Sequence, residues 1–427
     1  MNKTIWEQYL NTKEYPKVED NLETEVLVIG GGIAGLLTAK KLKENNIKVI
    51  LVEKDRIGRG TTMNTTAFLT VQHETLYQDL PFEKAKEYLR INNEALKEYE
   101  QLSKKYDFDF IKTKSCLFSE DKEKIKKEYL LLNELDQDVT LLEEIPFEKN
   151  CMAISFNDQA TINPAKLINC ISNDLEIYEY SEVIKIESNH AIFKNSKIIK
   201  FDKVVIATNY PINNKLNFLF MSLTQRRSYV VVIRKDKINN TYCSIDEDGM
   251  YYRMVDDHLI IGGNDRDTGN NCIKDFEYCV CDKFNITKDD IIYSWTEQDC
   301  ITTDGIPYIG YSDIFHKNHI IITGFNLWGF TWAMASSNIV LDIIKENKTC
   351  ELTKINRLTL NKNLMKNIKT SVKNIITFKK PKCTHLGCAL VYNKKERIWE
   401  CPCHGSVFNE DGDVIVGPAN KKIDFKQ

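Results

Sequence analysis

The sequence lacks a strong net charge. Its 58 lysines and arginines nearly balance its 61 aspartates and glutamates, so the formal charge is only -3 at pH 7. A chain with this balance has no overall electric field that would gather nucleic acid or an anionic membrane. We therefore expect no nucleic-acid partner.

Long apolar runs are also absent. Residues 1–20 contain no apolar core of the length that a signal peptide needs, and no later apolar run approaches the length of a membrane span. We therefore expect a cytoplasmic protein without a membrane span. The sequence contains neither an internal repeat nor a low-complexity tract, and a length of 427 residues would ordinarily divide into two or three domains.

The 13 cysteines fall into two groups. Nine are scattered singly between Cys116 and Cys350, and four are packed between Cys383 and Cys403. The scattered cysteines are typical of reduced thiols in a reducing compartment, whereas the packed group is typical of a metal site.

A βαβ unit is predicted near the N-terminus. An apolar strand (Val26–Ile29) leads through a glycine turn into a helix (Ile33–Asn45) and a second strand (Val49–Val52). The turn matches the G-x-G-x-x-G pattern, and Glu53 follows at the end of the second strand, as in dinucleotide-binding folds. A glycine turn without a ligand is the alternative, and the pattern alone does not distinguish FAD from NAD.

The remaining chain has a mixed pattern of helices and strands. Its basic stretch from Lys345 to Lys382 has a helical tendency, and we interpret it as a linker. Helices are predicted over 77–105, 121–135, 163–173 and 330–344, and strands over 183–186, 204–207, 229–233, 259–261 and 320–323.

Several segments resemble the D-amino-acid oxidase-like (DAO) family of FAD-dependent oxidoreductases. These are residues 24–70, the strand 203–209, the D-G-x-P-x-I-G stretch 304–310 and the turn 324–329, which opens a helix. In that family, the loop that here spans 59–67 wraps the pyrophosphate and approaches the flavin. The resemblance implies a bound FAD contacted by Gly30, Gly32, Gly35, Glu53, Gly60, Thr61, Thr62, Thr66, Ala67, Val183, Ala207, Thr208, Asp304, Gly324 and Gly329.

Two short motifs near the C-terminus predict an iron–sulfur centre. Cys383 with His385, and Cys401 with His404, supply one thiolate and one imidazole from each of two loops. A Rieske centre binds one iron through two thiolates and the other through two imidazoles, so it needs this ligand set. The alternatives are a zinc ribbon or an all-cysteine cluster, but neither explains the two histidines.

The same motifs resemble Rieske [2Fe-2S] domains. This resemblance implies that Cys388 and Cys403 form a disulfide that ties the two loops together. Residues 360–382, before the first motif, are shorter and more helical than the strands that Rieske domains have there. We therefore expect a shortened domain whose cluster loops are completed by packing on the flavin domain or on a neighbouring subunit.

The expected architecture is an α/β, Rossmann-like FAD domain interleaved with an α+β substrate domain, followed by a small all-β Rieske domain. The flavin-dependent region is expected to span 1–345, with FAD-binding parts at 20–75, 150–215 and 300–345 and substrate-side parts at 76–149 and 216–299. The linker is expected to span 346–374 and the Rieske domain 375–427.

The combined cofactors predict an oxidoreductase that couples two-electron chemistry to single-electron transfer. The DAO resemblance implies dehydrogenation of a small amine or amino acid, with electrons leaving through the cluster to an acceptor that could be a protein. The candidate catalytic residues are His73, which follows the flavin loop, and Tyr251 and Arg253, either of which could hold a carboxylate.

Two other functions remain open. The protein could be a flavin/Rieske electron-transfer module that serves a partner oxygenase or reductase, although no second nucleotide-binding motif for NADH is visible. It could also be a redox sensor, although the sequence contains no recognisable output domain.

Overall fold

The computed structural model describes residues 4–11, 13–146, 148–212, 219–235, 238–268, 273–312, 316–357, 361–377 and 380–425. Its helices are η1 (Glu7–Tyr9), α1 (Ile33–Glu44), η2 (Thr61–Met63), α2 (Leu76–Asp79), α3 (Phe82–Ser103), α4 (Lys122–Glu134), α5 (Pro164–Ser172), α6 (Leu219–Ser222), α7 (Ile273–Phe284), η3 (Lys288–Asp290), α8 (Gly329–Glu346) and α9 (Lys362–Ile375). Its strands are β1 (Leu22–Ile29), β2 (Val49–Val52), β3 (Phe68–Leu69), β4 (Ile111–Ser119), β5 (Val139–Leu142), β6 (Met152–Thr161), β7 (Glu176–Tyr178), β8 (Val183–Ile186), β9 (His190–Phe193), β10 (Ile198–Ile206), β11 (Leu223–Arg234), β12 (Thr241–Ser244), β13 (Met250–Val255), β14 (His258–Asp267), β15 (Ile291–Thr302), β16 (Tyr308–Tyr311), β17 (His319–Thr323), β18 (Val391–Asn393), β19 (Ile398–Glu400), β20 (Val407–Phe408) and β21 (Val414–Val416).

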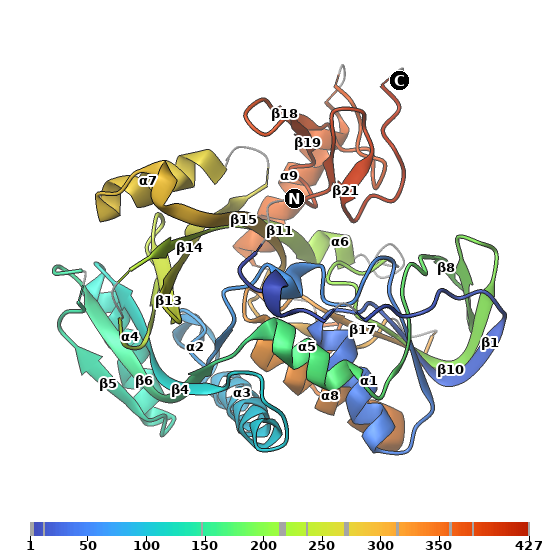
Figure 1. The fold of residues 1–427 in the computed structure, drawn as a ribbon, viewed down its shortest axis with the longest axis horizontal. Coiled ribbons are helices and arrows are strands. Elements are labelled where there is room, and N and C mark those ends of the chain that lie inside the picture. Colours follow the sequence, from blue (N-terminus) through green and yellow to red (C-terminus); the bar gives the residue numbers. More distant parts are fainter. Residues whose placement is uncertain are drawn as a thin grey trace.

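The first sheet is built around the βαβ unit. It has eight strands in the order β16-β17-β10-β1-β2-β7, with β8 and β9 attached through β10. β1 pairs in parallel with β10 on one side and β2 on the other, and its last four residues are buried. A continuous apolar run suits such a strand because helices cover a parallel sheet. Helices α1, α5 and α8 lie together beside this sheet (Figure 1).

The second sheet has nine strands in the order β15-β11-β14-β13-β12-β4-β6-β3, with β5 paired to β6. The chain leaves the first sheet and returns to it repeatedly, so the two sheets are interleaved in sequence. Helix α7 covers the outer part of the second sheet, where Phe276 and Val280 share a buried core with Tyr229 and Val231. This arrangement leaves the other side of strands β11 and β15 available to line a site.

The C-terminal unit is a small antiparallel sheet of four strands, in the order β18-β19-β20-β21. It lies beside β11 and β15 of the second sheet (Figure 1). Arg227 on β11 joins the two units through ion pairs to Glu396, at 2.7 Å, and Glu400, at 2.6 Å. Ion pairs of one arginine therefore attach the C-terminal sheet to the second sheet.

The predicted fold class is confirmed, with two local differences. The helix predicted over 77–105 is divided at Pro81 into α2 and α3, because proline cannot donate the backbone hydrogen bond that a continuous helix needs. The predicted linker 346–374 contains most of helix α9, although residues 358–360 lie outside the described part. Among the described helices, none is both long enough and apolar enough to pass through a bilayer.

Candidate functional site

A cavity of about 2620 Å³ is lined by residues from all three sheets. The glycine turn after β1 forms one part of its wall, Gln225 to Ser228 of β11 form another, and Val407 of β20 forms a third. The cavity therefore connects the predicted dinucleotide site with the C-terminal domain.

The glycine turn has the close contacts that dinucleotide-binding folds require. A Cβ atom on Gly30 would lie 2.4 Å from the carbonyl oxygen of Ala207, and Gly30 has a φ of +112°. A Cβ on Gly35 would lie only 1.9 Å from the Gly30 carbonyl oxygen. Only glycine fits at either position, and the turn therefore lets a phosphate group approach the N-terminus of α1.

Glu53, at the end of β2, lines the cavity beside the glycine turn. Its Oε2 accepts a hydrogen bond of 2.7 Å from the backbone N–H of Gly31, and its Oε1 accepts one of 3.0 Å from Asp55. Each carboxylate oxygen has a second lone pair, so ribose hydroxyls could still bind. Burial raises the pKa of Glu53, although these two hydrogen bonds oppose that shift.

Most of the residues predicted to contact FAD line the cavity, but three do not. Gly35 and Ala67 are two of these three. The residues that line it are Gly30, Gly32, Glu53, Gly60, Thr61, Thr62, Thr66, Val183, Ala207, Thr208, Gly324 and Gly329.

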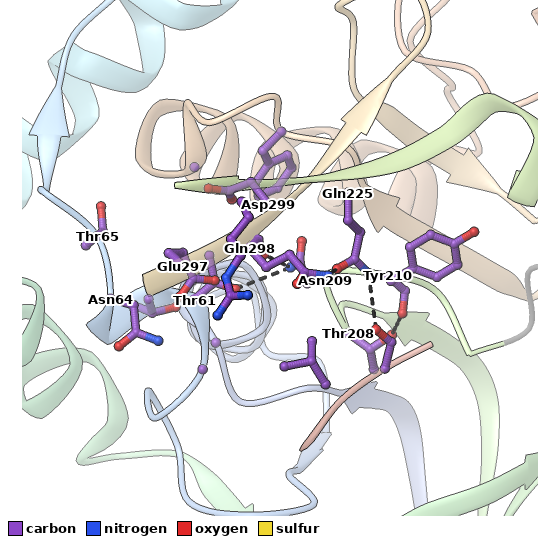
Figure 2. A pocket seen from close by; sticks show the side chains of 18 of the residues that line it. Thr61, Asn64, Thr65, Thr208, Asn209, Tyr210, Gln225, Glu297, Gln298 and Asp299 are labelled. Atoms are coloured by element: carbon purple, nitrogen blue, oxygen red, sulfur yellow. Dashed lines mark hydrogen bonds between the residues drawn. The ribbon is translucent and has the colours of Figure 1, made fainter. Parts of the chain in front are cut away.

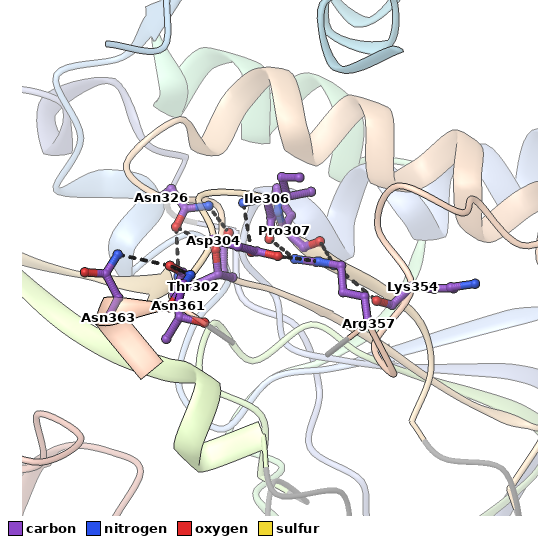
Figure 3. A network of polar contacts seen from close by, with 11 residues as sticks. Thr302, Asp304, Ile306, Pro307, Asn326, Lys354, Arg357, Asn361 and Asn363 are labelled. Carbon is purple, nitrogen blue, oxygen red and sulfur yellow. Dashed lines mark hydrogen bonds and ion pairs between the residues drawn. The ribbon is translucent and has the colours of Figure 1, made fainter. Parts of the chain in front are cut away.

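Asp304 is the third residue outside the cavity, and its carboxylate is already engaged. Arg357 donates to it through Nε, at 2.8 Å, and through a terminal nitrogen, at 3.0 Å (Figure 3). The expectation that Asp304 touches the cofactor gains no support, because this paired carboxylate instead holds the turn before β16. The sequence pattern could not reveal Arg357 as its partner.

Helix α8 begins beside the cavity, as its glycine turn predicts. Phe325, Leu327 and Trp328 line the cavity together with the glycines on either side. The helix has 18 residues, and its first turn carries the partial positive charge of the helix dipole. This end of α8 can stabilise negative charge in the cavity.

The part of the cavity near Tyr251 is rich in ionisable groups. Tyr251 Oη lies 3.4 Å from Asp265 Oδ1, while Glu74, Arg226 and Asp299 also line this region. Burial raises the pKa of Asp265 and Glu74, and burial together with repulsion from neighbouring acids raises that of Asp299 well above its ordinary value. Of these residues, we predicted only Tyr251.

One sequence signal could have revealed part of this acidic group. Glu297 and Asp299 are two residues apart on β15, a spacing that places both on the same side of a strand. Both line the cavity (Figure 2). Asp265 and Glu74 come from distant parts of the chain, so only the folded structure brings them near.

His73 does not reach the cavity. It is 1% exposed, its ring stacks on Trp328, and its Nδ1 lies 2.8 Å from Tyr88 Oη. Trp332 donates to the same Tyr88 oxygen, so the Tyr88 hydroxyl donates to His73 Nδ1 and the His73 Nε2–H donates to the Thr70 carbonyl at 2.9 Å. Burial lowers the pKa of His73 to about 3. The expected catalytic role is therefore unsupported, because His73 is neutral and enclosed.

Arg253 is also enclosed. It is 3% exposed, and one terminal nitrogen donates to the backbone carbonyls of Thr66, Ala67 and Ile162 at 2.8, 2.7 and 3.1 Å. Burial lowers its pKa to about 9. The structure thus contradicts the expected contact with a substrate carboxylate. Arg253 instead fixes the loop that the DAO resemblance assigns to the flavin.

The two Cys/His motifs converge in the C-terminal domain. Cys383, His385, Cys401 and His404 are 2%, 8%, 0% and 2% exposed, and the two imidazole rings lie 5.1 Å apart. Both loops contain the same turn, in which Gly387 donates to the Cys383 carbonyl and Gly405 to the Cys401 carbonyl.

The donor atoms suit a metal cluster. The Nδ1 atom of His404 is buried and has no hydrogen-bond partner among the described residues, which is costly unless it binds a ligand. Hydrogen bonds from Cys383, Cys388 and Cys403 hold the pKa of Cys401 well below its ordinary value, and the same contact with Cys401 raises the pKa of Cys383, so the group of thiols favours one thiolate, at Cys401. These atoms fit an iron–sulfur cluster.

The expected disulfide between Cys388 and Cys403 is not formed in this structure. Both are free cysteines, and their sulfur atoms lie within 4.8 Å of each other and of the Cys401 sulfur. The three thiols share hydrogen bonds, so this expectation was wrong for the structure described. Three converging sulfurs would also suit an all-cysteine site, but the buried imidazoles beside them favour a mixed ligand set.

Tyr210 connects the cavity wall with the Cys/His motifs. It lines the cavity, and its ring meets those of His385 and His404 edge to face, with centroids 6.0 and 6.3 Å apart. A chain of hydrogen bonds also joins the second Cys/His loop to the cavity wall. Gln298 Nε2 donates to the Gly405 carbonyl at 2.6 Å. Asn209 in turn donates to the Gln298 carbonyl, at 3.3 Å, and to Thr61 on the cavity wall, at 3.2 Å (Figure 2).

A cavity lined by a dinucleotide-binding turn, with a Cys/His centre behind Tyr210 of its wall, defines a flavin-dependent oxidoreductase with an attached iron–sulfur domain. The sequence model described as "FAD dependent oxidoreductase" (DAO) matches residues 25–343, and that of the Rieske [2Fe-2S] domain matches residues 356–425. The chain belongs to the DAO family of FAD-dependent oxidoreductases and ends in a Rieske domain. It is an oxidoreductase whose cofactors are FAD and a [2Fe-2S] cluster.

Known proteins resemble both parts. YhfW of Bacillus subtilis, whose name describes it as a Rieske 2Fe-2S iron–sulfur protein, is 26% identical over 98% of this chain and 96% of its own. L-proline dehydrogenase from P. horikoshii has a TM-score of 0.65 at 21% identity over 77% of this chain and 95% of its own. Glycine oxidase from Geobacillus kaustophilus has a TM-score of 0.66 at 16% identity over 79% of this chain and 100% of its own. The two solved structures establish the likeness of fold.

Proposed function

We propose that the protein dehydrogenates a small amine or amino acid and passes the electrons through its Rieske cluster to a separate acceptor. One observation carries this proposal. Tyr210 lines the cavity and also packs against His385 and His404, so the histidine side of the cluster site is turned toward the cavity. FAD supplies two-electron oxidation and a Rieske cluster supplies single-electron transfer. A cluster that faces the cavity could therefore accept electrons one at a time from the reduced flavin.

We assign the cluster ligands and the FAD contacts from this arrangement. Cys383, His385, Cys401 and His404 would hold the two irons, because they supply two thiolates and two imidazoles from paired loops. The glycine turn would receive the pyrophosphate, Glu53 the adenosine ribose, and the N-terminus of α8 the flavin ring. We keep the predicted domain bounds as a proposal, with α9 as a folded part of the linker.

The ionisable groups near Tyr251 support an amine or amino acid as the substrate. Asp265 and Glu74 could bind the ammonium group, and Arg226 could bind a carboxylate. Oxidation removes one hydrogen from carbon and one from nitrogen, leaves a C=N bond and delivers two electrons to FAD. The named functions of the similar folds, which include L-proline dehydrogenase and glycine oxidase, agree with this substrate class.

Anaerobic stopped-flow spectroscopy of the holoprotein would test the proposal. Mixing with a panel of amines and amino acids should bleach the flavin first, and freeze-quenched samples should then show the reduced Rieske signal by electron paramagnetic resonance. Bleaching by NADH alone would contradict the proposal and favour an electron-transfer module. A flavin that is bleached by an amine while the cluster stays oxidised would contradict the internal electron route.

A further inference from the structure

One segment of the chain has a charge unlike the rest. Residues 352–395 contain eleven lysines and arginines and no aspartate or glutamate, although the whole chain has slightly more acidic than basic residues. Helix α9 lies within this segment. Four of these cations pair with acidic side chains outside the segment, and the surplus positive charge lies on the others, which include Lys362, Lys369 and Lys373 of α9.

Polar side chains attach α9 to the rest of the protein. The amides of Asn361 and Asn363 both donate to the Thr303 carbonyl, at 2.7 and 3.0 Å (Figure 3). Asn367 donates to the Met221 carbonyl at 3.4 Å. The side of α9 that faces the protein is therefore largely an amide surface.

Apolar side chains lie on the outer side of the same helix. Met365, Val372 and Ile376, which is the residue that caps α9, are 61%, 53% and 62% exposed. Their spacing of seven and four residues aligns them in one stripe along the helix. A helix on the surface of a water-soluble protein normally has the opposite arrangement, with its apolar side facing the protein core.

Lysines run along the edge of this stripe. Lys362, Lys369 and Lys373 are exposed and are three, four or seven residues from an apolar member, so they flank the stripe on the same outer side. A stripe of large apolar side chains bordered by lysines, on a helix of low average hydrophobicity, is typical of helices that lie in a membrane interface. Lysine stems can lie along the lipid while their ammonium groups reach the phosphates.

We propose that α9 docks the protein on an anionic membrane surface. The apolar stripe enters the boundary between headgroups and acyl chains, and the flanking lysines contact lipid phosphates. A protein interface ordinarily matches charges of both signs, whereas the charged side chains that border the stripe, Lys362, Lys369 and Lys373, are all positive, which suits a continuous negative surface. Because the Ala389 N–H donates to the Asn374 carbonyl at 2.9 Å, docking keeps the first cluster loop near the membrane, on the side of α9 that faces the protein.

Vesicle flotation of the full-length holoprotein would test this proposal. The protein should float with vesicles of phosphatidylglycerol and phosphatidylcholine in equal parts, but not with phosphatidylcholine alone. Lys369→Gln with Lys373→Gln should weaken binding roughly thirtyfold, because each lysine near a charged membrane contributes about a fivefold factor. Met365→Gln with Val372→Gln should also weaken binding, although it leaves the charge unchanged.

Helix α4 provides matched controls. Its Lys127 is exposed and its Leu130 is 67% exposed, so Lys127→Gln and Leu130→Gln change similar surface side chains away from α9. Both controls should float like the unchanged protein. Absence of binding to anionic vesicles at low salt would overturn the proposal. Equal losses for the α4 and α9 variants, or binding only to an acidic protein, would overturn it as well.

Discussion

At the scale of single residues, the burial of His73 gives the stability of the protein a dependence on pH. Its pKa is about 3 in the folded protein, compared with an ordinary value of 6.5. Between these two pH values His73 is protonated in the unfolded chain and neutral in the folded chain. Each unit by which the pH falls therefore lowers the free energy of unfolding by about 1.4 kcal/mol through this residue. His73→Asn should remove that part of the slope in urea unfolding measured from pH 6 to pH 4.

The same variant tests the predicted catalytic role of His73. Because the ring is enclosed by Tyr88, Thr70 and Trp328, we expect His73→Asn to keep the rate of flavin reduction by substrate. Loss of flavin reduction in a variant that remains folded and retains FAD would restore His73 as a catalytic residue.

His404 is the residue whose loss should separate the two cofactors. Its buried Nδ1 has no hydrogen-bond partner among the described residues, and in our assignment it binds iron. His404→Ala should abolish the Rieske signal of the dithionite-reduced protein in electron paramagnetic resonance, while the yellow FAD absorbance persists. His190→Ala, which changes a histidine of β9 in the first sheet, should leave both signals intact. A Rieske signal in the His404 variant would exclude this ligand assignment.

At the scale of elements, the turn between β1 and α1 requires its glycines. A Cβ at Gly30 or Gly35 would collide with a backbone carbonyl oxygen, and backbone cannot move aside as a side chain can. Gly35→Ala should therefore destabilise the protein by roughly 3 kcal/mol or more and deplete it of FAD. Thermal unfolding and the flavin content of the purified protein would measure both effects.

Gly60 provides a control for this prediction. A Cβ placed on Gly60 meets no atom within 4 Å, so Gly60→Ala should unfold at nearly the same temperature as the unchanged protein. Equal destabilisation by Gly35→Ala and Gly60→Ala would show that the close contact at Gly35 is not the cause.

At the scale of the whole molecule, Arg227 holds the Rieske domain on the flavin domain. Its side chain is 12% exposed and pairs with Glu396 and with Glu400, whose side chain is 1% exposed. Arg227→Met would leave a buried carboxylate without its cation, so we expect a loss of roughly 3–5 kcal/mol in the free energy of unfolding. Urea unfolding would measure this loss, and the transfer of electrons from flavin to cluster should slow.

An exposed ion pair in the same domain serves as the comparison. Arg397 pairs with Glu410 at 2.6 Å, but its side chain is 73% exposed and solvent screens the attraction. Arg397→Met should change neither the unfolding curve nor the electron transfer appreciably. Similar losses in both variants would argue against Arg227 as the specific connection between the domains.

The sequence by itself determined the local chemistry of this protein. The apolar run before Gly30 predicted β1, the spacing of Gly30, Gly32 and Gly35 predicted the turn and α1, and the paired motifs at Cys383 and Cys401 predicted the Rieske domain. Each of these features depends on residues that are near one another in the chain, so period and spacing are sufficient to predict them.

Only the tertiary structure decided which side chains face the cavity. His73 and Arg253 have residue types suited to catalysis, but packing encloses them, whereas Asp265, Glu74 and Tyr210 come from distant segments and line the cavity. The physical reason is that burial and partnership depend on contacts between segments far apart in sequence, which the local pattern of residues does not encode.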